Sequence, residues 1–248
     1  MNGAPLANLR GDYAAMASDW TVPQHARYSA EDQETWRILV ERQSKLAKQF
    51  ACEEFLAGLS TLGIGRTIPN FDEVSARLEK LTGWRIVGVP GLIPDNAFYD
   101  HLAHRRFPVT VWIRTRKELD YLVEPDLFHD FFGHVPLLSL PVFADYMQLY
   151  GQRALEAGAQ IDLLARLYWY TVEFGLIRTK NGLKIYGSGI LSSAAEVKHA
   201  MLDKGVEHLP FEAASVMRRP YVIDKLQSTY FVLDDFRQLF EAAQTRIA

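Results

Sequence analysis

The stretch EPDLFHDFFGHVPLL, residues 124–138, places two histidines, an aspartate and a glycine in a run of large apolar side chains. His129 and His134 are five residues apart. On a regular α-helix five residues turn about 500°, which leaves the two imidazoles about 140° apart. Gly133 and Pro136 disfavour regular helical hydrogen bonding. We therefore expect the helix to loosen in its last turn, to bring His134 towards His129, and to stop at Pro136.

The histidine pair supports two interpretations. Histidines in an apolar run can be core residues with satisfied hydrogen bonds, and for a pair at this spacing taken alone this is the simpler interpretation. They can also hold a metal ion if a third ligand comes from elsewhere in the chain. The metalloprotease pair is four residues apart and faces one way, so the spacing here differs from that class.

A candidate third ligand lies in YWYTVEFGL, residues 168–176. Glu173 is the only charged residue between Arg166 and Arg178. An unpaired carboxylate is costly to bury, so Glu173 pairs with one of these arginines, lies at an exposed helix edge, or binds a metal. Two imidazoles and one carboxylate form the facial triad typical of non-haem Fe(II), with positions open for oxygen and substrate. Zinc hydrolases use the same ligand types, so oxidation and hydrolysis both remain open.

The composition indicates one globular domain. The chain has 248 residues, no repeat, and 48% hydrophobic and 23% charged residues, which suits a single buried core. The net charge is −3 and no Lys/Arg cluster stands out, so we expect no nucleic-acid and no membrane partner. Cys52 is the only cysteine, and no stretch has the length of a signal peptide core or a membrane span. We therefore expect a cytoplasmic protein.

The spacing of apolar residues predicts a mostly α-helical fold with small β elements. An irregular segment over about residues 1–28 precedes a helix that Ser29 caps and that the glycines at 58, 63 and 65 end. Asn181-Gly182 predicts a β-hairpin over residues 175–189, and Ser192 or Ser193 caps the helix that follows. The other expected helices are 72–83, 141–158 and 160–175, the expected strands are 84–91 and 107–114, and residues 228–243 form a strand and then a helix.

Several long motifs together resemble a known family. The stretches at 124–138 and 168–176, followed by YGSGILSS at 186–193, are similar in order and spacing to the catalytic domain of the pterin-dependent aromatic amino acid hydroxylases. TGWRIVGVPGLIP at 82–94 and DWTVPQHARYS at 19–29 extend the resemblance to the short bacterial, phenylalanine-acting members. The similarity covers about residues 19–236. It implies the hydroxylase catalytic-domain fold and the conversion of L-phenylalanine to L-tyrosine.

The resemblance implies one Fe(II) bound by His129, His134 and Glu173, with a tetrahydropterin such as tetrahydrobiopterin as cofactor and O2 as co-substrate. The family pattern places an arginine for the substrate carboxylate at Arg114, and a planar guanidinium fork suits that task. Ser192 matches a substrate-side serine, although a helix N-cap is its rival role. The residues expected to line the ring pocket are Pro125, Trp169, Phe174 and Gly189.

The expected pterin site begins in GLIPDNAF, residues 91–98. Backbone groups there would hydrogen-bond the heterocycle, Phe98 would stack on it, and two further side chains would lie near its far edge. Animal members have Glu at the position of Asp130 and a hydroxyl residue at that of Leu122, which leaves details of both pockets open. The residues that the resemblance assigns to this site are Gly91, Leu92, Ile93, Phe98, Asp130 and Tyr168.

Ring selectivity depends on a position in PYVIDKLQSTYFV, residues 220–232, that aligns with the residue facing the para carbon of the substrate. Tyrosine-acting members resemble one another in having Asp there, whereas this chain has Ile223. A phenol against isoleucine would bury an unpaired hydroxyl at about 1–3 kcal/mol. This predicts that phenylalanine is preferred over tyrosine by about ten- to a hundredfold in kcat/KM. The alternative is that Ile223 is ordinary core and the choice is made elsewhere.

Alternatives from other classes remain. A tyrosine- or tryptophan-acting sibling would share the triad, and a non-catalytic pterin-binding protein would need a broken one. A zinc hydrolase would lack a general base, because no Glu follows His129 at the position that metalloproteases use, although Asp130 could take that role. Larger members carry a regulatory domain and a tetramerisation helix. The motifs begin early and the tail is short for a heptad seam, so we expect residues 1–248 to form a single catalytic domain, without either part, that is a monomer.

Overall fold

The structure is a computed structural model that describes residues 10–23 and 28–244. The predicted irregular segment falls partly on residues 1–9 and 24–27, which lie outside the described residues. In its described part, Tyr13–Ala15 forms one 3-10 turn that the Asp12 side chain caps. The described helices include none with the length and apolar character that a membrane crossing requires.

The long first helix begins where the sequence predicts. Helix α1, Ala30–Phe50, starts with a capping box in which Ser29 and Asp32 accept each other's backbone N–H groups. It ends earlier than expected, because the Cys52 N–H donates to the Ile185 carbonyl, 2.9 Å away. A separate helix α2, Glu53–Leu62, follows, with Gly63 as its left-handed cap. A bond to a distant strand therefore sets the helix end.

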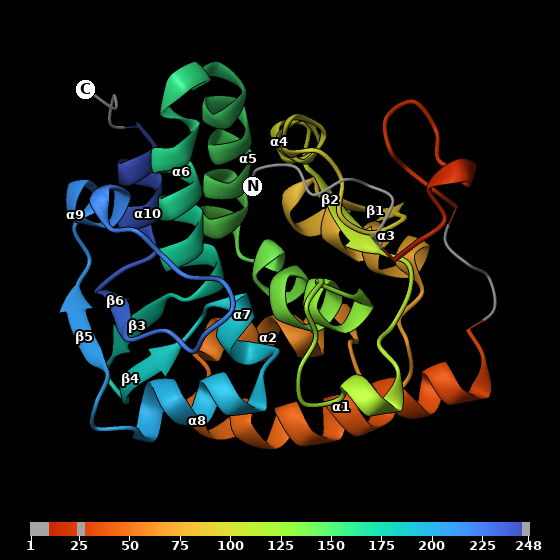
Figure 1. Cartoon of the computed structure of the whole chain (residues 1–248), viewed down its shortest axis with the longest axis horizontal. Helices are drawn as coiled ribbons and strands as arrows, with labels where there is room; N and C mark the ends of the chain where they lie inside the picture. The colour runs from red at the N-terminus through yellow and green to blue at the C-terminus, as the bar shows by residue number, and fades with distance from the viewer. Residues whose placement is uncertain (1–9, 24–27, 245–248) are drawn as a thin grey trace.

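The two strands predicted around residues 84–114 form a small parallel sheet. Strand β1, Arg85–Val89, pairs with β2, Arg106–Thr110. Helix α4, Asp95–Ala103, makes the crossover that parallel strands need, and α3, Phe71–Thr82, ends at Gly83 as predicted. Figure 1 shows this unit on the opposite side of the molecule from the larger sheet.

The larger sheet has the order β4-β3-β6-β5. The predicted hairpin is confirmed, and Gly182 takes the positive φ, +91°, that the turn requires. Strand β6 pairs in parallel with both β3 and β5, so the sheet is mixed, and this pairing was not predicted. The bounds of the strands are β3 Leu176–Thr179, β4 Gly182–Ile185, β5 Glu207–Pro210 and β6 Thr229–Leu233.

Helices surround the two sheets. Helices α5 and α6 stand together between the sheets in Figure 1, and α1 runs along the base of the molecule. Ser193 rather than Ser192 caps α8, since its hydroxyl accepts the Glu196 N–H. Three elements, α7, α9 and β5, were not predicted. The bounds of these helices are α5 Pro141–Glu156, α6 Ile161–Tyr168, α7 Ser188–Leu191, α8 Ala194–Leu202, α9 Ala213–Arg218 and α10 Arg237–Gln244.

The segment around the histidines lies at the centre of the core. Phe128 and Phe132 stack at 4.9 Å, and the Trp36 ring of α1 meets Phe128 edge-on at 5.5 Å. Phe55 of α2 meets Phe132 at 5.7 Å. These rings are almost wholly buried. Burial of these aromatic side chains therefore anchors the histidine segment in the core.

Candidate metal centre

His129 and His134 occupy the two ends of a π-helical segment, His129–His134. A π-helix closes its hydrogen bonds between residues five apart, so side chains at this spacing come to the same side. The two Nε2 atoms lie 3.2 Å apart. The predicted approach of the histidines is confirmed, but through a π-helix rather than a frayed turn. The π-helix ends at His134, close to the predicted stop at Pro136, and the chain then continues as a separate 3-10 turn, Val135–Ser139, with Pro136 in its first turn.

Glu173 ends a second π-helical segment, Trp169–Glu173, which continues from α6. Its Oε1 is 3.1 Å from Nε2 of His134, and its Oε2 is 3.7 Å from Nε2 of His129. Neither flanking arginine takes it as a partner. Arg166 donates to the Met217 carbonyl and Arg178 pairs with Asp234. The metal-ligand interpretation of Glu173 is therefore the one that the geometry supports.

The three side chains fit a metal ion. Their ligand atoms all lie within 4.8 Å of one another. With metal–ligand bonds of about 2.1 Å, adjacent ligand atoms at right angles lie about 3.0 Å apart. The Nε2–Nε2 and Nε2–Oε1 separations of 3.2 and 3.1 Å are close to this value. Two imidazoles and a carboxylate on one side of a point suit non-haem Fe(II).

Charge states at the cluster also suit a metal. Burial lowers the pKa of His129 to about 4, so its ring is neutral at neutral pH. Burial raises the pKa of Glu173, but the neighbouring His134 and His129 more than offset this and hold it at about 2. A neutral imidazole and an ionised carboxylate are the forms that bind metals, so these two groups need not lose a proton to bind.

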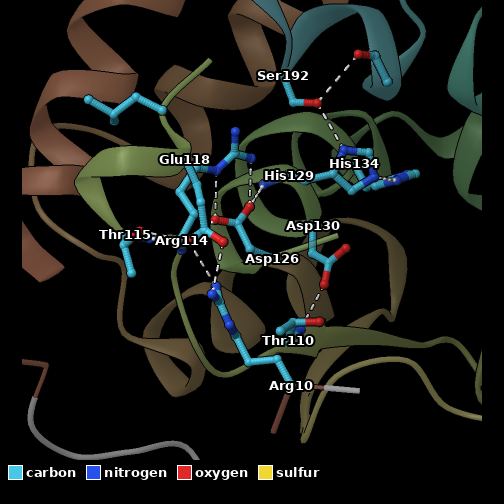
Figure 2. Close-up of polar contacts among 12 residues, drawn as sticks. Arg10, Thr110, Arg114, Thr115, Glu118, Asp126, His129, Asp130, His134 and Ser192 are labelled. Carbon is cyan, nitrogen blue, oxygen red and sulfur yellow. Dashed lines mark hydrogen bonds and ion pairs between the residues drawn. The ribbon is translucent and has the colours of Figure 1, made fainter. Parts of the chain in front are cut away.

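Neighbouring polar groups hold the ligands in place. Figure 2 shows the Ser192 hydroxyl against the His129 ring, with Oγ 2.8 Å from Nδ1. The Ser188 hydroxyl donates to Glu173 Oε2 at 3.0 Å. Such contacts fix the orientation of a ligand. Ser192 therefore lies beside a metal ligand, and its rival role as a helix cap is excluded because Ser193 holds that position.

Arg114, the predicted carboxylate-binding residue, is held by Asp126 (Figure 2). Its Nε and Nη2 donate to the two carboxylate oxygens at 2.9 and 2.8 Å, and these two bonds leave Nη1 unused. Asp126 is fully buried. Burial raises the pKa of Asp126, but Arg114 more than offsets this and keeps it below its usual value.

Sequence reasoning missed Asp126, which also accepts the backbone N–H of His129 at 3.0 Å. An aspartate three residues before a helical position is a typical N-terminal capping arrangement, and that signal could have identified it. Ser188, in the motif at residues 186–193, was missed as well. Asp126 ties the arginine to the first metal ligand.

Of the predicted ring-pocket residues, Phe174 and Gly189 lie next to Glu173, and Trp169 packs on Phe174. The Trp169 and Phe174 rings lie 4.7 Å apart. A Cβ at Gly189 would come within 2.9 Å of the Phe174 ring and 3.1 Å of Glu173 Oε2, so a larger residue would displace these side chains. Pro125 is half-buried directly before Asp126.

Ile223 is placed differently from the other ring-pocket residues. It lies in the loop between α9 and β6, and 68% of it is exposed. Its neighbour Val222 is 53% exposed. The alternative that Ile223 is ordinary core is therefore wrong, because the loop runs across the surface here. The expected contact of Ile223 with the substrate ring stays a prediction.

The predicted pterin turn, Gly91 to Ile93, joins β1 to α4. A Cβ at Gly91, with φ +155°, would lie 2.7 Å from the Arg10 carbonyl oxygen and 2.9 Å from the Tyr13 hydroxyl. Tyr13 donates to the Leu92 carbonyl at 3.0 Å. Sequence reasoning missed this contact, since the residues are far apart in the chain. The N-terminal segment thus packs directly against the turn.

A row of rings connects this region with the metal ligands. Phe98 meets Tyr168 edge-on at 5.9 Å, and Tyr168 stacks against His134 at 6.3 Å. Asp130 instead points to β2 (Figure 2), where Oδ2 accepts the Thr110 N–H at 2.8 Å. Burial raises the pKa of Asp130 to about 7. The structure therefore brings Phe98 and Tyr168 to the ligands and shows Asp130 fastening β2 to the π-helix.

Comparisons with known proteins agree with this geometry. A family model described as biopterin-dependent aromatic amino acid hydroxylase matches residues 8–246. Phenylalanine-4-hydroxylase from Mesorhizobium japonicum is 52% identical over 240 residues, which is 96% of this chain and 87% of that protein. The predicted family and the similarity to phenylalanine-acting bacterial members are confirmed.

Two crystal structures of Chromobacterium violaceum phenylalanine hydroxylase match the fold. One, with iron and phenylalanine bound, has a TM-score of 0.88 and 49% identity, and covers 96% of this chain and 87% of that chain. The other, with iron(III) and 7,8-dihydrobiopterin, has a TM-score of 0.88 and 52% identity, over 92% and 84% of the two chains. The predicted catalytic-domain fold is confirmed. The chain belongs to the biopterin-dependent aromatic amino acid hydroxylase family.

Proposed function

We propose that this chain hydroxylates L-phenylalanine to L-tyrosine, with a tetrahydropterin and O2, at an Fe(II) ion held by His129, His134 and Glu173. The observation that carries the proposal is the convergence of two imidazole nitrogens and one carboxylate on a single point. The chain that shows this convergence is about half identical to phenylalanine-4-hydroxylases over nearly its whole length. When bound, the iron supplies the centre at which the pterin and O2 react.

The chain's own residues hold that centre in a fixed and dry position. Ser192 and Ser188 orient His129 and Glu173. The phenylalanines of the histidine segment are almost completely buried and keep water from one side of it. Exclusion of water protects a reactive centre from side reactions. The site is therefore suited to oxidation of an unactivated aromatic ring.

Substrate placement follows from Arg114 and the ring-side residues. Arg114 would bind the amino-acid carboxylate, with its guanidinium held at the correct angle by Asp126. Trp169, Phe174, Pro125 and Gly189 would enclose the ring beside Glu173. Positioning of this kind is a large part of catalysis, since it turns a bimolecular encounter into a fixed geometry.

Pterin binding is assigned to the turn between β1 and α4. The backbone of Gly91, Leu92 and Ile93 would hydrogen-bond the heterocycle, and Phe98 would stack on it. Tyr168, between Phe98 and His134, would form the wall nearest the metal. Asp130 would support the pterin site indirectly, because its hydrogen bond to the Thr110 N–H holds β2 against the π-helix.

The acid considered as a general base for the hydrolase alternative does not face the ligand cluster. Asp130 was the acid considered for that role, and its carboxylate faces the Thr110 N–H on β2 rather than the ligand cluster (Figure 2). A general base has to reach the proton that it removes. The sibling enzymes that act on tyrosine or tryptophan are separated from this proposal by substrate tests.

The assembly and location of the chain are further proposals. We infer a monomeric, single-domain, cytoplasmic enzyme with no nucleic-acid partner. The net charge of −3 supports the absence of a nucleic-acid partner, and the single cysteine supports a reducing compartment. Light scattering tests the monomeric state. A mass of 28.2 kDa is expected, and a mass twice as large would contradict a monomer.

One experiment tests the function. The purified chain is loaded with Fe(II) and incubated with O2, a tetrahydropterin and phenylalanine, and tyrosine is measured by mass spectrometry. Matched samples contain Zn(II) in place of Fe(II), or omit the pterin, or replace phenylalanine with tyrosine or tryptophan. Tyrosine formed only with Fe(II) and pterin supports the proposal. Equal use of tyrosine or tryptophan contradicts the assignment to phenylalanine.

A further inference from the structure

Gln227 is a buried side chain with no role in the site described above. It lies in the loop between α9 and β6, drawn in blue in Figure 1, and is only 6% exposed. Its Oε1 accepts the Trp169 indole N–H at 3.0 Å. Its Nε2 donates to the carbonyls of Val222 and Lys225 at 3.0 and 2.9 Å. One amide thus joins the ring wall of the site to the loop that carries Ile223.

The orientation of this amide is determined by its partners. The indole N–H of Trp169 can only donate, and a backbone carbonyl can only accept. If the amide were flipped, its NH2 would face the indole donor and its oxygen would face the carbonyls of Val222 and Lys225. All three hydrogen bonds would then be lost, so a single arrangement of Gln227 satisfies every partner.

The backbone of Gln227 is anchored on the opposite side. Its N–H donates to Oε1 of Glu196 at 3.1 Å, and its carbonyl lies 3.1 Å from Nε2 of His199. Glu196, on α8, is 5% exposed and also accepts the Tyr230 hydroxyl at 2.6 Å. A residue bonded through both its backbone and its side chain has little freedom, so it can serve as a fixed point for the groups attached to it.

Trp169 is held on its edge and its faces by these contacts. The Tyr221 ring, from the same loop, stacks on it at 4.5 Å with an interplanar angle of 17°. Phe174 lies 4.7 Å away. Trp169 also begins the π-helical segment that ends at Glu173. A shift of the indole would therefore move the ring wall relative to the metal ligand four residues later.

We propose that Gln227 is a positioning residue for the aromatic substrate. It fixes the indole of Trp169 in its plane and holds residues 221–226 beside it, and so sets where the substrate ring lies relative to the metal centre. The inference rests on the proposed function, because it concerns the ring that this function oxidises. It adds a second residue of the stretch at 220–232 to the determinants of substrate placement.

The principal test is Gln227→Met, which keeps the length of the side chain and removes its three hydrogen bonds. With these bonds lost, we expect the KM for phenylalanine to rise about tenfold. We expect less tyrosine per pterin oxidised, because a misplaced ring is attacked less often. The KM for the pterin should stay within about twofold, since the side chain does not reach Phe98 or the pterin turn.

A second measurement does not depend on activity. Hydrogen exchange of the Trp169 indole N–H can be followed by NMR in the metal-free protein, with the signal identified by its loss in Trp169→Phe. Loss of its acceptor should speed this exchange in Gln227→Met by at least about tenfold. The indole signals of Trp36 and Trp84, which donate to the Gly65 and Ala144 carbonyls, serve as internal references.

Gln227→Glu separates the two halves of the contact. A carboxylate still accepts the Trp169 N–H but faces the carbonyls of Val222 and Lys225, which repel it. We expect indole protection to be retained and phenylalanine KM to rise less than in Gln227→Met. Tyr230→Phe is the matched control, because it removes a buried hydrogen bond to the same Glu196 without touching Trp169 or the loop.

The outcomes distinguish failure of the proposed function from failure of the positioning role of Gln227. If the wild type forms no tyrosine, the proposed function fails. If the wild type is active and Gln227→Met keeps its phenylalanine KM and its coupling, the positioning role is overturned. It is equally overturned if Tyr230→Phe reproduces all the effects of Gln227→Met, since general loosening would then explain them. Should Gln227→Met not fold, an unchanged phenylalanine KM in Gln227→Glu overturns it alone.

Discussion

The metal ligands and the loop between α9 and β6 are built in opposite ways. The ligands His129, His134 and Glu173 lie on helical segments inside an aromatic core, and two of them have a serine contact of their own. The loop exposes Val222, Ile223 and Leu226 by 53%, 68% and 48%.

This contrast indicates a division of tasks. The reaction requires ligand atoms fixed to within a fraction of an ångström, which buried and redundantly bonded helices provide. The loop is attached inward through Gln227, the Tyr221 ring and the bond from the Tyr170 hydroxyl to the Pro220 carbonyl. We therefore propose that substrate selectivity can change there without disturbing the metal. The predictions below test the contrast, beginning with the largest expected effect.

His134→Ala should abolish both product formation and tight metal binding while the fold survives. The triad loses one of its three ligands, and two remaining ligands do not hold the ion in place. Metal content by atomic emission and tyrosine yield by mass spectrometry are the measurements. His104→Ala is the control, because that ring lies on the surface with 61% of its side chain exposed. A His134→Ala protein with nearly full activity would show that the triad is assigned wrongly.

The histidine segment shows how far the sequence alone leads. Gly133 and Pro136 indicate a disturbed helix, and the histidines do converge. The π-helical form was not predictable in the second segment, because YWYTVEF contains neither glycine nor proline to mark a widened turn. The role of Glu173 was inferred from charge and resemblance. The distances from its carboxylate oxygens to the histidine Nε2 atoms depend on packing that no local pattern encodes.

Long-range bonds explain the other differences. Helix α1 ends at Phe50, with no breaker in the sequence, because Cys52 bonds to the Ile185 carbonyl. The contact of Tyr13 with Leu92 joins residues 79 positions apart. The placement of Gln227 against Trp169 spans 58 positions. Capping, turns and apolar spacing are local and were predicted, whereas such contacts depend on the assembled fold.

Asp126→Ala should be the most destabilising change outside the triad. It leaves the Arg114 guanidinium buried without its partner, which typically costs about 3–5 kcal/mol. Urea unfolding of the metal-free protein measures the loss. Asp234→Ala, which breaks an exposed pair with Arg178, should cost less than about 1 kcal/mol. Equal losses in the two variants would contradict the view that Arg114 depends on Asp126.

Phe98→Ala should weaken pterin binding at the turn between β1 and α4. Aromatic stacking contributes about 0.5–1.5 kcal/mol beyond area burial. The pterin KM should therefore rise by roughly three- to tenfold, at about 1.4 kcal/mol per decade. The KM for phenylalanine should change less. An unchanged pterin KM would remove Phe98 from the cofactor site.

Glu196, whose carboxylate accepts the Gln227 N–H, should make the free energy of unfolding depend on pH. Glu196→Gln should remove this dependence. Burial raises the pKa of Glu196 above its ordinary value of 4.5. The folded chain then holds this proton more tightly than the unfolded chain. The resulting stabilisation is fully present below pH 4.5 and is lost as pH rises through the folded pKa.

The glutamine still accepts the Tyr230 hydroxyl but carries no charge to bury. The free energy of unfolding of Glu196→Gln relative to the wild type should therefore increase from pH 4.5 towards pH 8, by an amount on the order of one hydrogen bond, about 1 kcal/mol. Thermal unfolding at several pH values measures it. A difference that does not depend on pH would show that Glu196 titrates normally.

Ile223→Asp should have the smallest effect. A buried phenol hydroxyl without a partner would cost about 1–3 kcal/mol, but a side chain that is 68% exposed leaves such a hydroxyl in contact with water. The mutant should therefore shift the preference between phenylalanine and tyrosine by less than about threefold in kcat/KM. Val222→Asp, at the exposed neighbouring position, should behave in the same way. A shift of tenfold or more in Ile223→Asp alone would mean that the loop closes over the bound ring, with Gln227 as the point about which it is held. The loop would then be as much a part of the reaction chamber as the helices that carry the metal ligands.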